Sequence, residues 1–285
     1  MSAIRIIEGS DRSRLGEGPL WSARENAVYW VDILGRRLRR LSLESGAIAN
    51  WDMPEPIGWV IERHTAAGFI AGFATGFAEM TLDPLTIRPI GNPEPDLPGN
   101  RMNDAKADPQ GRIWAGTMAA DCKGMTGSLY RLDPDRKWAL VDGPYGIANG
   151  PAISADGSML YHTDTARRRV YRFDLLDDGL LGPRHVHIRF KEEWGSPDGM
   201  TLDAEGGLWV AHWGGGRVSR FTPDGELDRS IDLPASQITS CAFAGPDLDR
   251  MFVTSAADGV DEPHAGMLFE IDPGCRGLPT STFGG

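Results

Sequence analysis

The chain has 285 residues, of which 41% are hydrophobic and 24% are charged, the composition of an ordinary globular protein. Its formal net charge of −11 argues against a nucleic-acid-binding surface. No apolar run approaches the roughly 18 residues that a membrane-spanning helix needs. We therefore expect neither nucleic acid nor a membrane as a partner.

The N-terminal residues and the cysteines indicate the cellular compartment in which the protein is expected. Residues 1–14 mix charges with a short apolar run and do not resemble a signal peptide. Cys122, Cys241 and Cys275 lie far apart and form no CxxC motif, which disfavours both a disulfide framework and a thiolate zinc site. We expect a cytoplasmic protein, either a monomer or a small homo-oligomer.

A short sequence motif recurs along the chain. It consists of a turn with Asp and Gly, a short apolar run with an aromatic residue, and then small residues. Clear copies cover 108–117 and 203–211, and looser copies cover 21–30 and 149–162. The apolar anchors of the copies are spaced by 40, 44, 47, 48 and 43 residues. They are Trp30, Ile70, Trp114, Tyr161, Trp209 and Phe252. Blade repeats of β-propellers recur at about 40–50 residues, so these anchors predict six blades.

Strand-like segments with alternating apolar and polar residues follow several anchors. They cover 127–134, 169–174, 216–223 and 266–273. Period-2 patterning between turn residues indicates hairpins, and 36 glycines with 20 prolines would break helices repeatedly. The sequence therefore predicts an all-β fold.

One six-bladed β-propeller domain over residues 1–285 is the architecture that this spacing favours. The ring must close, and residues 4–7 are the natural strand to pair near the C-terminal blade. A boundary between two domains at 134–137 is disfavoured, because the repeat spacing continues through it.

Polar residues interrupt the repeat just ahead of four anchors, where the innermost strands of a propeller line its channel. The segments are 15–21, 99–105, 146–151 and 194–200. Each could be only a turn, because Asn-Gly and Asp-Gly are strong turn signals. Their shared phase in the repeat favours a site at one mouth of the channel.

Three of these residues have the chemistry of metal ligands. Glu17 and Asp198 supply carboxylates, and Asn149 adds a neutral amide oxygen. Oxygen ligands of this kind suit a hard cation such as Ca²⁺, Mg²⁺ or Mn²⁺. Two carboxylates in one channel would repel each other unless a cation lay between them. We therefore predict a metal site in the central channel, with positions left for water and substrate.

Arg101 and Asn103 occupy the same phase of the repeat. A guanidinium group there is suited to oxygen-rich substrate atoms, with the Asn103 amide beside it. The alternative is a salt bridge from Arg101 to Asp104 or Asp108, and the residues alone leave both open.

Together these segments resemble the SMP-30/gluconolactonase/LRE-like family, also described as regucalcin-like, over nearly the whole chain. The resemblance is carried by 15–19, 101–104, 114–118, 127–130, 196–200 and 203–209. It implies a six-bladed propeller with one catalytic divalent metal in the channel. The identity of the metal stays open among Ca²⁺, Mg²⁺, Mn²⁺, Zn²⁺ and Fe²⁺.

The resemblance also implies roles for individual residues. It makes Glu17, Asn149 and Asp198 the metal ligands and Asp198 the general base. It makes Arg101 and Asn103 substrate-binding residues, with Asn103 near the metal's water.

In the lid loop, residues 119–126, Asp121 takes the place of a glutamate that the family often has there, one methylene longer. Residues 161–165 look like the sugar-lactonase branch, whose bacterial members open aldonolactones.

The predicted function is metal-dependent hydrolysis of a sugar lactone to its aldonic acid in carbohydrate catabolism, of the gluconolactonase, xylonolactonase or arabinonolactonase type. Such an enzyme is a carboxylic ester hydrolase that needs no nucleophilic serine, and the chain has no Gly-x-Ser-x-Gly motif. One alternative is a metal-dependent esterase or phosphotriesterase on the same scaffold. Another is a calcium-binding propeller without catalysis.

Overall fold

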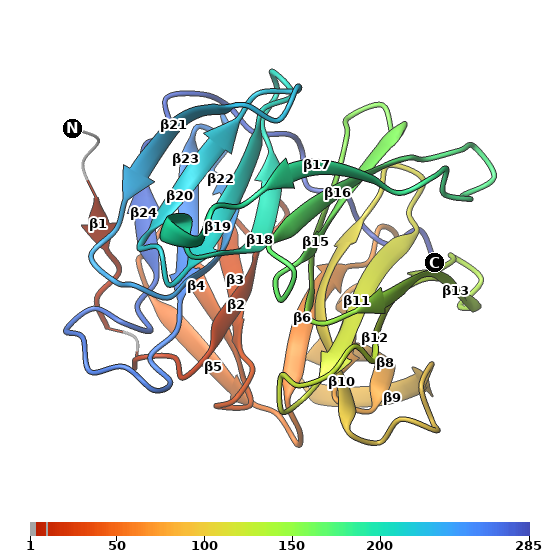
Figure 1. The fold of residues 1–285 in the computed structure, drawn as a ribbon. Helices are drawn as coiled ribbons and strands as arrows, with labels where there is room; N and C mark the ends of the chain where they lie inside the picture. Colours follow the sequence, from red (N-terminus) through yellow and green to blue (C-terminus); the bar gives the residue numbers. More distant parts are fainter. Residues whose placement is uncertain (1–3, 10) are drawn as a thin grey trace.

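The alternating strands fold into six four-stranded antiparallel sheets within residues 4–9 and 11–285, the part of the chain that the computed structural model describes. The sheets surround a channel, and Figure 1 shows this arrangement of blades. Blade one holds β2 (Gly16–Ser22), β3 (Ala27–Asp32), β4 (Arg37–Ser42) and β5 (Ile48–Asp52). Blade two holds β6 (Ile57–Glu62), β7 (Phe69–Phe73), β8 (Gly76–Leu82) and β9 (Leu85–Gly91).

The next two blades repeat the same order of strands. Blade three holds β10 (Asn100–Ala107), β11 (Ile113–Ala119), β12 (Gly127–Leu132) and β13 (Trp138–Tyr145). Blade four holds β14 (Ala148–Ile153), β15 (Met159–Asp164), β16 (Arg169–Asp174) and β17 (His185–Arg189). A short 3-10 helix, η1 (Glu192–Trp194), leads into blade five.

The ring closes in blade six through the N-terminus. Blade five holds β18 (Ser196–Leu202), β19 (Leu208–Trp213), β20 (Arg217–Phe221) and β21 (Leu227–Asp232). Blade six holds β22 (Ile238–Ala244), β23 (Arg250–Ser255) and β24 (Phe269–Ile271), and its fourth strand is β1 (Arg5–Ile6). β1 pairs with β24, which confirms the predicted closure. No helix in the described residues is long and apolar enough to cross a membrane.

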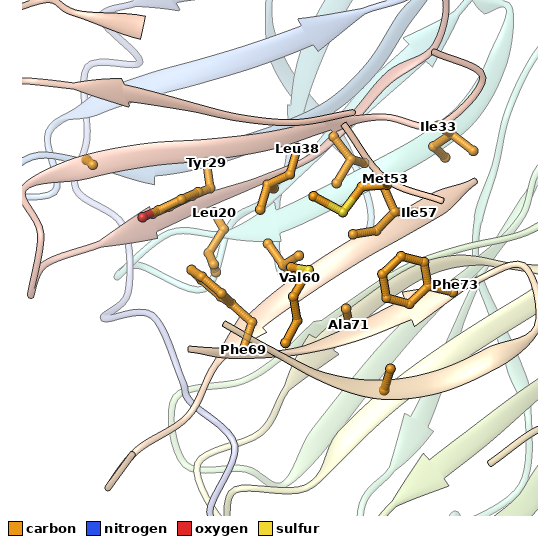
Figure 2. Close-up of a cluster of buried hydrophobic side chains, with 14 residues drawn as sticks. Leu20, Tyr29, Ile33, Leu38, Met53, Ile57, Val60, Phe69, Ala71 and Phe73 are labelled. Atoms are coloured by element: carbon orange, nitrogen blue, oxygen red, sulfur yellow. The ribbon is translucent and has the colours of Figure 1, made fainter. Parts of the chain in front are cut away.

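All six predicted anchors are buried on the second strand of their blade, which confirms the repeat and its phase. Apolar side chains then fill the space between neighbouring blades. Figure 2 shows the cluster between blades one and two, where Leu20, Leu38, Val60 and Phe73 pack together. Burying such side chains stabilises the fold by roughly 1.5–3 kcal/mol each.

The Asp and Trp of the repeat are joined by a hydrogen bond in the two clear copies. The Trp114 indole donates to Asp108 at 2.8 Å, and the Trp209 indole donates to Asp203 at 2.9 Å. Asp203 also accepts backbone bonds from the turn that follows it and pairs with Arg220 at 2.6 Å. The aspartate therefore joins the turn of each copy to its buried aromatic anchor.

Asp203→Ala is expected to lower the free energy of unfolding by about 2–3 kcal/mol, because it leaves the buried Trp209 indole without an acceptor and removes one of the three carboxylate partners of Arg220. Chemical denaturation measures the loss. Asp247→Ala, at an exposed position, is the control and should change stability by less than about 0.5 kcal/mol. Equal effects of the two substitutions would contradict this role for Asp203.

Two buried histidines make stability depend on pH. Burial lowers the pKa of His162 to about 3 and that of His212 to about 4. Both rings are therefore neutral in the folded protein at pH 5, whereas an unfolded histidine becomes protonated below about pH 6.5. Their contribution to the free energy of unfolding is complete above about pH 6.5 and is lost as the pH falls below that value.

We expect His162→Phe to remove part of this acid sensitivity. The ring packs edge-on against Tyr145 with centroids 4.6 Å apart, and neither ring nitrogen has a hydrogen-bond partner in the described residues. Between pH 7 and pH 5 the wild type should lose about 2 kcal/mol more stability than the variant, measured by urea unfolding at each pH. Replacement of His185, which is exposed on β17, should leave the pH dependence unchanged. An unchanged dependence in His162→Phe would contradict the prediction.

The C-terminal segment crosses one end of the channel. After β24, Arg276 bonds to Ala204 of blade five, while Phe283 bonds to Glu62 of blade two. Gly284 then donates to Gly111 in blade three, so the chain ends beside that blade, as Figure 1 also shows. Residues 278–281 lie between these attachments and line the channel.

Candidate active site in the central channel

Each inner strand breaks its pairing register once, at a corresponding position. The breaks lie between Glu17 and Leu20, Ile57 and Trp59, Met102 and Ala105, Asn149 and Ala152, Pro197 and Met200, and Ile238 and Ser240. Such β-bulges turn a side chain out of the regular alternation and are common beside active sites. Four of the polar residues that interrupt the repeat fall at or inside these bulges, namely Glu17, Asn103, Asn149 and Asp198, and Arg101 lies one residue ahead of the break in β10.

Glycines allow the bulges to approach one another. Gly18, next to Glu17, has a φ of +53°, a conformation that favours glycine. A Cβ at Gly58 would lie 2.7 Å from the backbone oxygen of Asn103. The missing side chain at Gly58 therefore lets the backbone of blade three pack closely against blade two beside the site.

Glu17 and Asp198 place two carboxylates in the interior, 5% and 4% exposed respectively. Burial and the neighbouring Asp198 and Asp104 charges raise the pKa of Glu17 well above its usual range. Burial and Asp104 likewise raise the pKa of Asp198. Oδ1 of Asp198 is buried and has no hydrogen-bond partner in the described residues. Neither carboxylate forms an ion pair within 4.0 Å among the described residues, so ionising both in the metal-free site is unfavourable.

A chain of hydrogen bonds orders the amide side of the site. Arg101 donates to Oδ1 of Asn103 at 2.7 Å, and Nδ2 of Asn103 donates to Oδ1 of Asn149 at 2.8 Å. Nδ2 of Asn149 donates to Thr165 at 3.0 Å, and Thr165 donates to the backbone oxygen of Pro197 at 2.7 Å. These contacts join blades three, four and five and turn the Asn149 oxygen toward the Asn103 side.

Arg101 is buried and makes no ion pair within 4.0 Å among residues 4–9 and 11–285. Asp108 pairs with Arg112 instead, at 2.6 Å. The salt-bridge alternative for Arg101 is therefore wrong. Its charge lies within electrostatic range of Glu17 and Asp198.

Asp104 is a third channel carboxylate, which sequence alone offers only as a partner for Arg101. It is 2% exposed, and one of its oxygens accepts from the Ala105 backbone at 2.7 Å while the other has no partner in the described part of the chain. Burial raises the pKa of Asp104 to about 6. Its position inside the bulge of β10 could not be predicted, because a bulge changes the face to which a side chain points.

The lid loop places Asp121 outside this cluster. Its side chain is exposed and accepts from the Lys123 backbone at 3.0 Å. The neighbouring Cys122 is a free thiol and is exposed as well. A substrate contact by Asp121 stays a prediction.

The donor set fits a hard divalent cation. It contains two buried carboxylates, one of them with an orphaned oxygen, and a neutral amide oxygen, all from different blades. Among the described residues no three His, Cys, Asp or Glu side chains group closely enough to hold a metal by themselves. Glu17 and Asp198 would therefore need Asn149 and water as further ligands, which agrees with the preference of Ca²⁺ and Mg²⁺ for mixed oxygen ligands.

Known proteins resemble this chain along its length. A family model described as SMP-30/Gluconolactonase/LRE-like region matches residues 15–257. Regucalcin of Gallus gallus is 37% identical over 100% of both chains, and a pentonolactonase of Haloferax volcanii is 37% identical over 98% of this chain and 97% of its own. The crystal structure of a calcium-binding protein, regucalcin, from Agrobacterium tumefaciens superimposes with a TM-score of 0.93 at 31% identity, covering 99% of this chain and 97% of its own. The repeat, the six blades and the matched residues together make this chain a member of the SMP-30/gluconolactonase/LRE-like family.

Proposed function

We propose that the protein hydrolyses sugar lactones, opening the cyclic ester of an aldonolactone to the aldonic acid. Glu17, Asn149 and Asp198 would hold one divalent cation at the channel site. The observation that best supports this is the pair of buried carboxylates, neither in an ion pair among the described residues and one with an orphaned oxygen, beside a neutral amide oxygen. The relative from Haloferax volcanii is named a pentonolactonase, which agrees with a lactone substrate.

In this proposal each side chain has a separate role in ester hydrolysis. Asp198 takes a proton from the attacking water as general base, because its Oδ1 has no hydrogen-bond partner in the described residues and is free to accept one. Arg101 and Asn103 bind substrate hydroxyls and orient the ring, which lowers the entropic part of the barrier. A divalent cation, when bound, supplies Lewis-acid polarisation of the ring carbonyl.

A calcium-binding propeller without catalysis is the second candidate, since the similar Agrobacterium structure is described as a calcium-binding protein. The hydrogen-bonded pair Arg101 and Asn103 favours catalysis, because calcium binding alone needs neither a guanidinium nor a second amide. The cytoplasm remains the proposed location, supported by free thiols at Cys122, Cys241 and Cys275.

The test is a panel assay on protein freed of metal with a chelator. Glucono-, xylono-, arabinono- and galactonolactones are supplied with Ca²⁺, Mg²⁺, Mn²⁺, Zn²⁺ or Fe²⁺, and acid release is followed at constant pH. A phosphotriester and a simple aryl ester are run beside them. We expect cation-dependent opening of at least one lactone. Acid release no faster than spontaneous opening under every cation would refute the lactonase proposal, and turnover of the aryl ester or phosphotriester alone would favour the esterase.

A further inference from the structure

A cavity of 270 Å³ continues the channel away from the carboxylates. All six inner strands line it with the residues that follow their bulges, so it lies toward the C-terminal ends of those strands. Residues 278–281 of the C-terminal segment also line it. We name this space the lower chamber. Its volume is just below the roughly 300–1,000 Å³ of typical ligand pockets.

Lys106 is the charged side chain of the lower chamber. It extends from β10 of blade three, yet its charge acts on both Asp104 and Cys241. Cys241 lies on β22 of blade six, across the ring from blade three, so the ammonium group lies near the channel axis. Among residues 4–9 and 11–285, Lys106 makes neither an ion pair within 4.0 Å nor a side-chain hydrogen bond. A half-buried ammonium without an acceptor is unfavourable.

Hydroxyl groups accompany this charge. Thr201, Thr280 and Ser281 line the chamber, are half-buried, and make no side-chain hydrogen bond within the described chain. No Asp or Glu side chain belongs to the lining, and most of the remaining wall is apolar, with Leu20, Ile61 and Phe243 among it. The chamber therefore presents one cation and several free donors without an acidic acceptor.

We propose that the lower chamber binds a small oxyanion, a carboxylate or phosphate group held by Lys106 and the hydroxyls of the C-terminal segment. Charge-assisted hydrogen bonds from lysine and hydroxyl groups are the usual means of holding such anions. Asp104 lies on the catalytic side of Lys106 and offers the competing explanation, in which Lys106 only balances that carboxylate. The proposal does not depend on the lactonase reaction.

The chain offers a direct readout, because it has only four lysines: Lys106, Lys123, Lys137 and Lys191. Protein labelled with ¹³C at lysine Cε gives one signal for each, and Lys106→Met identifies the signal of Lys106. Inorganic phosphate, sulfate, acetate and gluconate are titrated at constant ionic strength, with and without Ca²⁺. We expect the Lys106 signal alone to move and to saturate, and the melting temperature to rise with it.

Matched variants separate binding from general screening. Lys106→Met should weaken the anion-dependent rise in melting temperature at least about tenfold, and the double variant Thr280→Val, Ser281→Ala should weaken it by a smaller factor. Lys137→Met, at an exposed ion pair with Asp135, should leave it unchanged. A response to phosphate but not to carboxylates, or the reverse, identifies the head group.

Three results would overturn the proposal. The first is that all four lysine signals drift together without saturation, and the second is that none moves. The third is a response that needs Ca²⁺ and persists in Lys106→Met, which would place the anion at the carboxylate site instead. None of these depends on acid release from lactones, so the lower chamber and the lactonase proposal can fail separately.

Discussion

Asp198→Asn is expected to lower lactone hydrolysis by about 10³-fold or more while raising the melting temperature of the metal-free protein. The first effect follows because the amide cannot accept the proton of the attacking water, and general-base catalysis contributes roughly 10²–10⁴-fold. The second follows because Asp198 is a buried charge beside Asp104 and Glu17, and the isosteric amide removes that repulsion. A rise of roughly 2–4 °C corresponds to about 1 kcal/mol.

Opposite signs for activity and stability make this test specific. A substitution that merely damaged the fold would lower both quantities. Initial rates on the best lactone of the panel and thermal unfolding after chelation measure the two effects on the same preparation. Activity within tenfold of the wild type would remove Asp198 as the base, and a lower melting temperature would contradict the electrostatic description of the site.

Glu17→Gln is expected to weaken divalent cation binding at least about 100-fold, because it removes one of two charged ligands, whereas loss of even an outer partner costs 10–100-fold. Calorimetry with Ca²⁺ and Mn²⁺ measures the affinity. The cation-induced rise in melting temperature should fall with it, since a ligand that binds only the folded state stabilises it by RT ln(1 + [L]/Kd).

Glu62→Gln is the matched control for this prediction. Glu62 is also a buried glutamate on an inner strand, but it accepts from Ser22 at 2.7 Å outside the carboxylate cluster. Its amide variant should bind the cation as the wild type does. If both variants bound equally well, Glu17 would not be a ligand, and the orphaned oxygen of Asp198 would need another explanation.

The sequence predicted the architecture well, because the repeat is built from local chemistry. Asp108 and Asp203 each accept a hydrogen bond from the indole nitrogen six residues later. One short sequence motif therefore specifies the turn, the buried anchor and the second strand of the blade. The spacing of the anchors then gives the number of blades. The N-terminal strand was predicted to complete the last blade because the ring of blades must close. Each of these predictions depends on contacts within a blade or at a known junction.

The sequence predicted the residues of the site and its place in the channel, but the orientations of the side chains could not be predicted because they depend on contacts between blades. Bulges in the inner strands decide which side chains face the channel, and no residue pattern specified them. Asp104 illustrates this, since it directly follows Asn103 in β10, where regular alternation would point it to the opposite face, yet its charge acts on Glu17 and Asp198. The lid shows the same limit, because Asp121 is exposed and accepts a hydrogen bond from within its own loop.

The path of the C-terminal segment across the channel also could not be predicted from the sequence. Its residues follow the last anchor and have no repeat partner, so no periodicity indicated that they cross the channel. Their bonds to Ala204, Glu62 and Gly111 join blades that are far apart in the chain. Residues 278–281 of this segment form part of the wall of the lower chamber.

The most direct test of the proposed function is the initial rate of acid release as a function of cation bound per chain. Chelated protein is reconstituted stepwise with the best cation of the panel, and bound metal and rate are measured on the same samples. The proposed site requires the rate to rise in proportion to occupancy and to level off at one cation per chain, with Glu17→Gln shifting the curve to higher cation concentration. A rate that is unaffected by chelation, or that stays at the spontaneous value when one cation is bound, would contradict a metal-dependent lactonase.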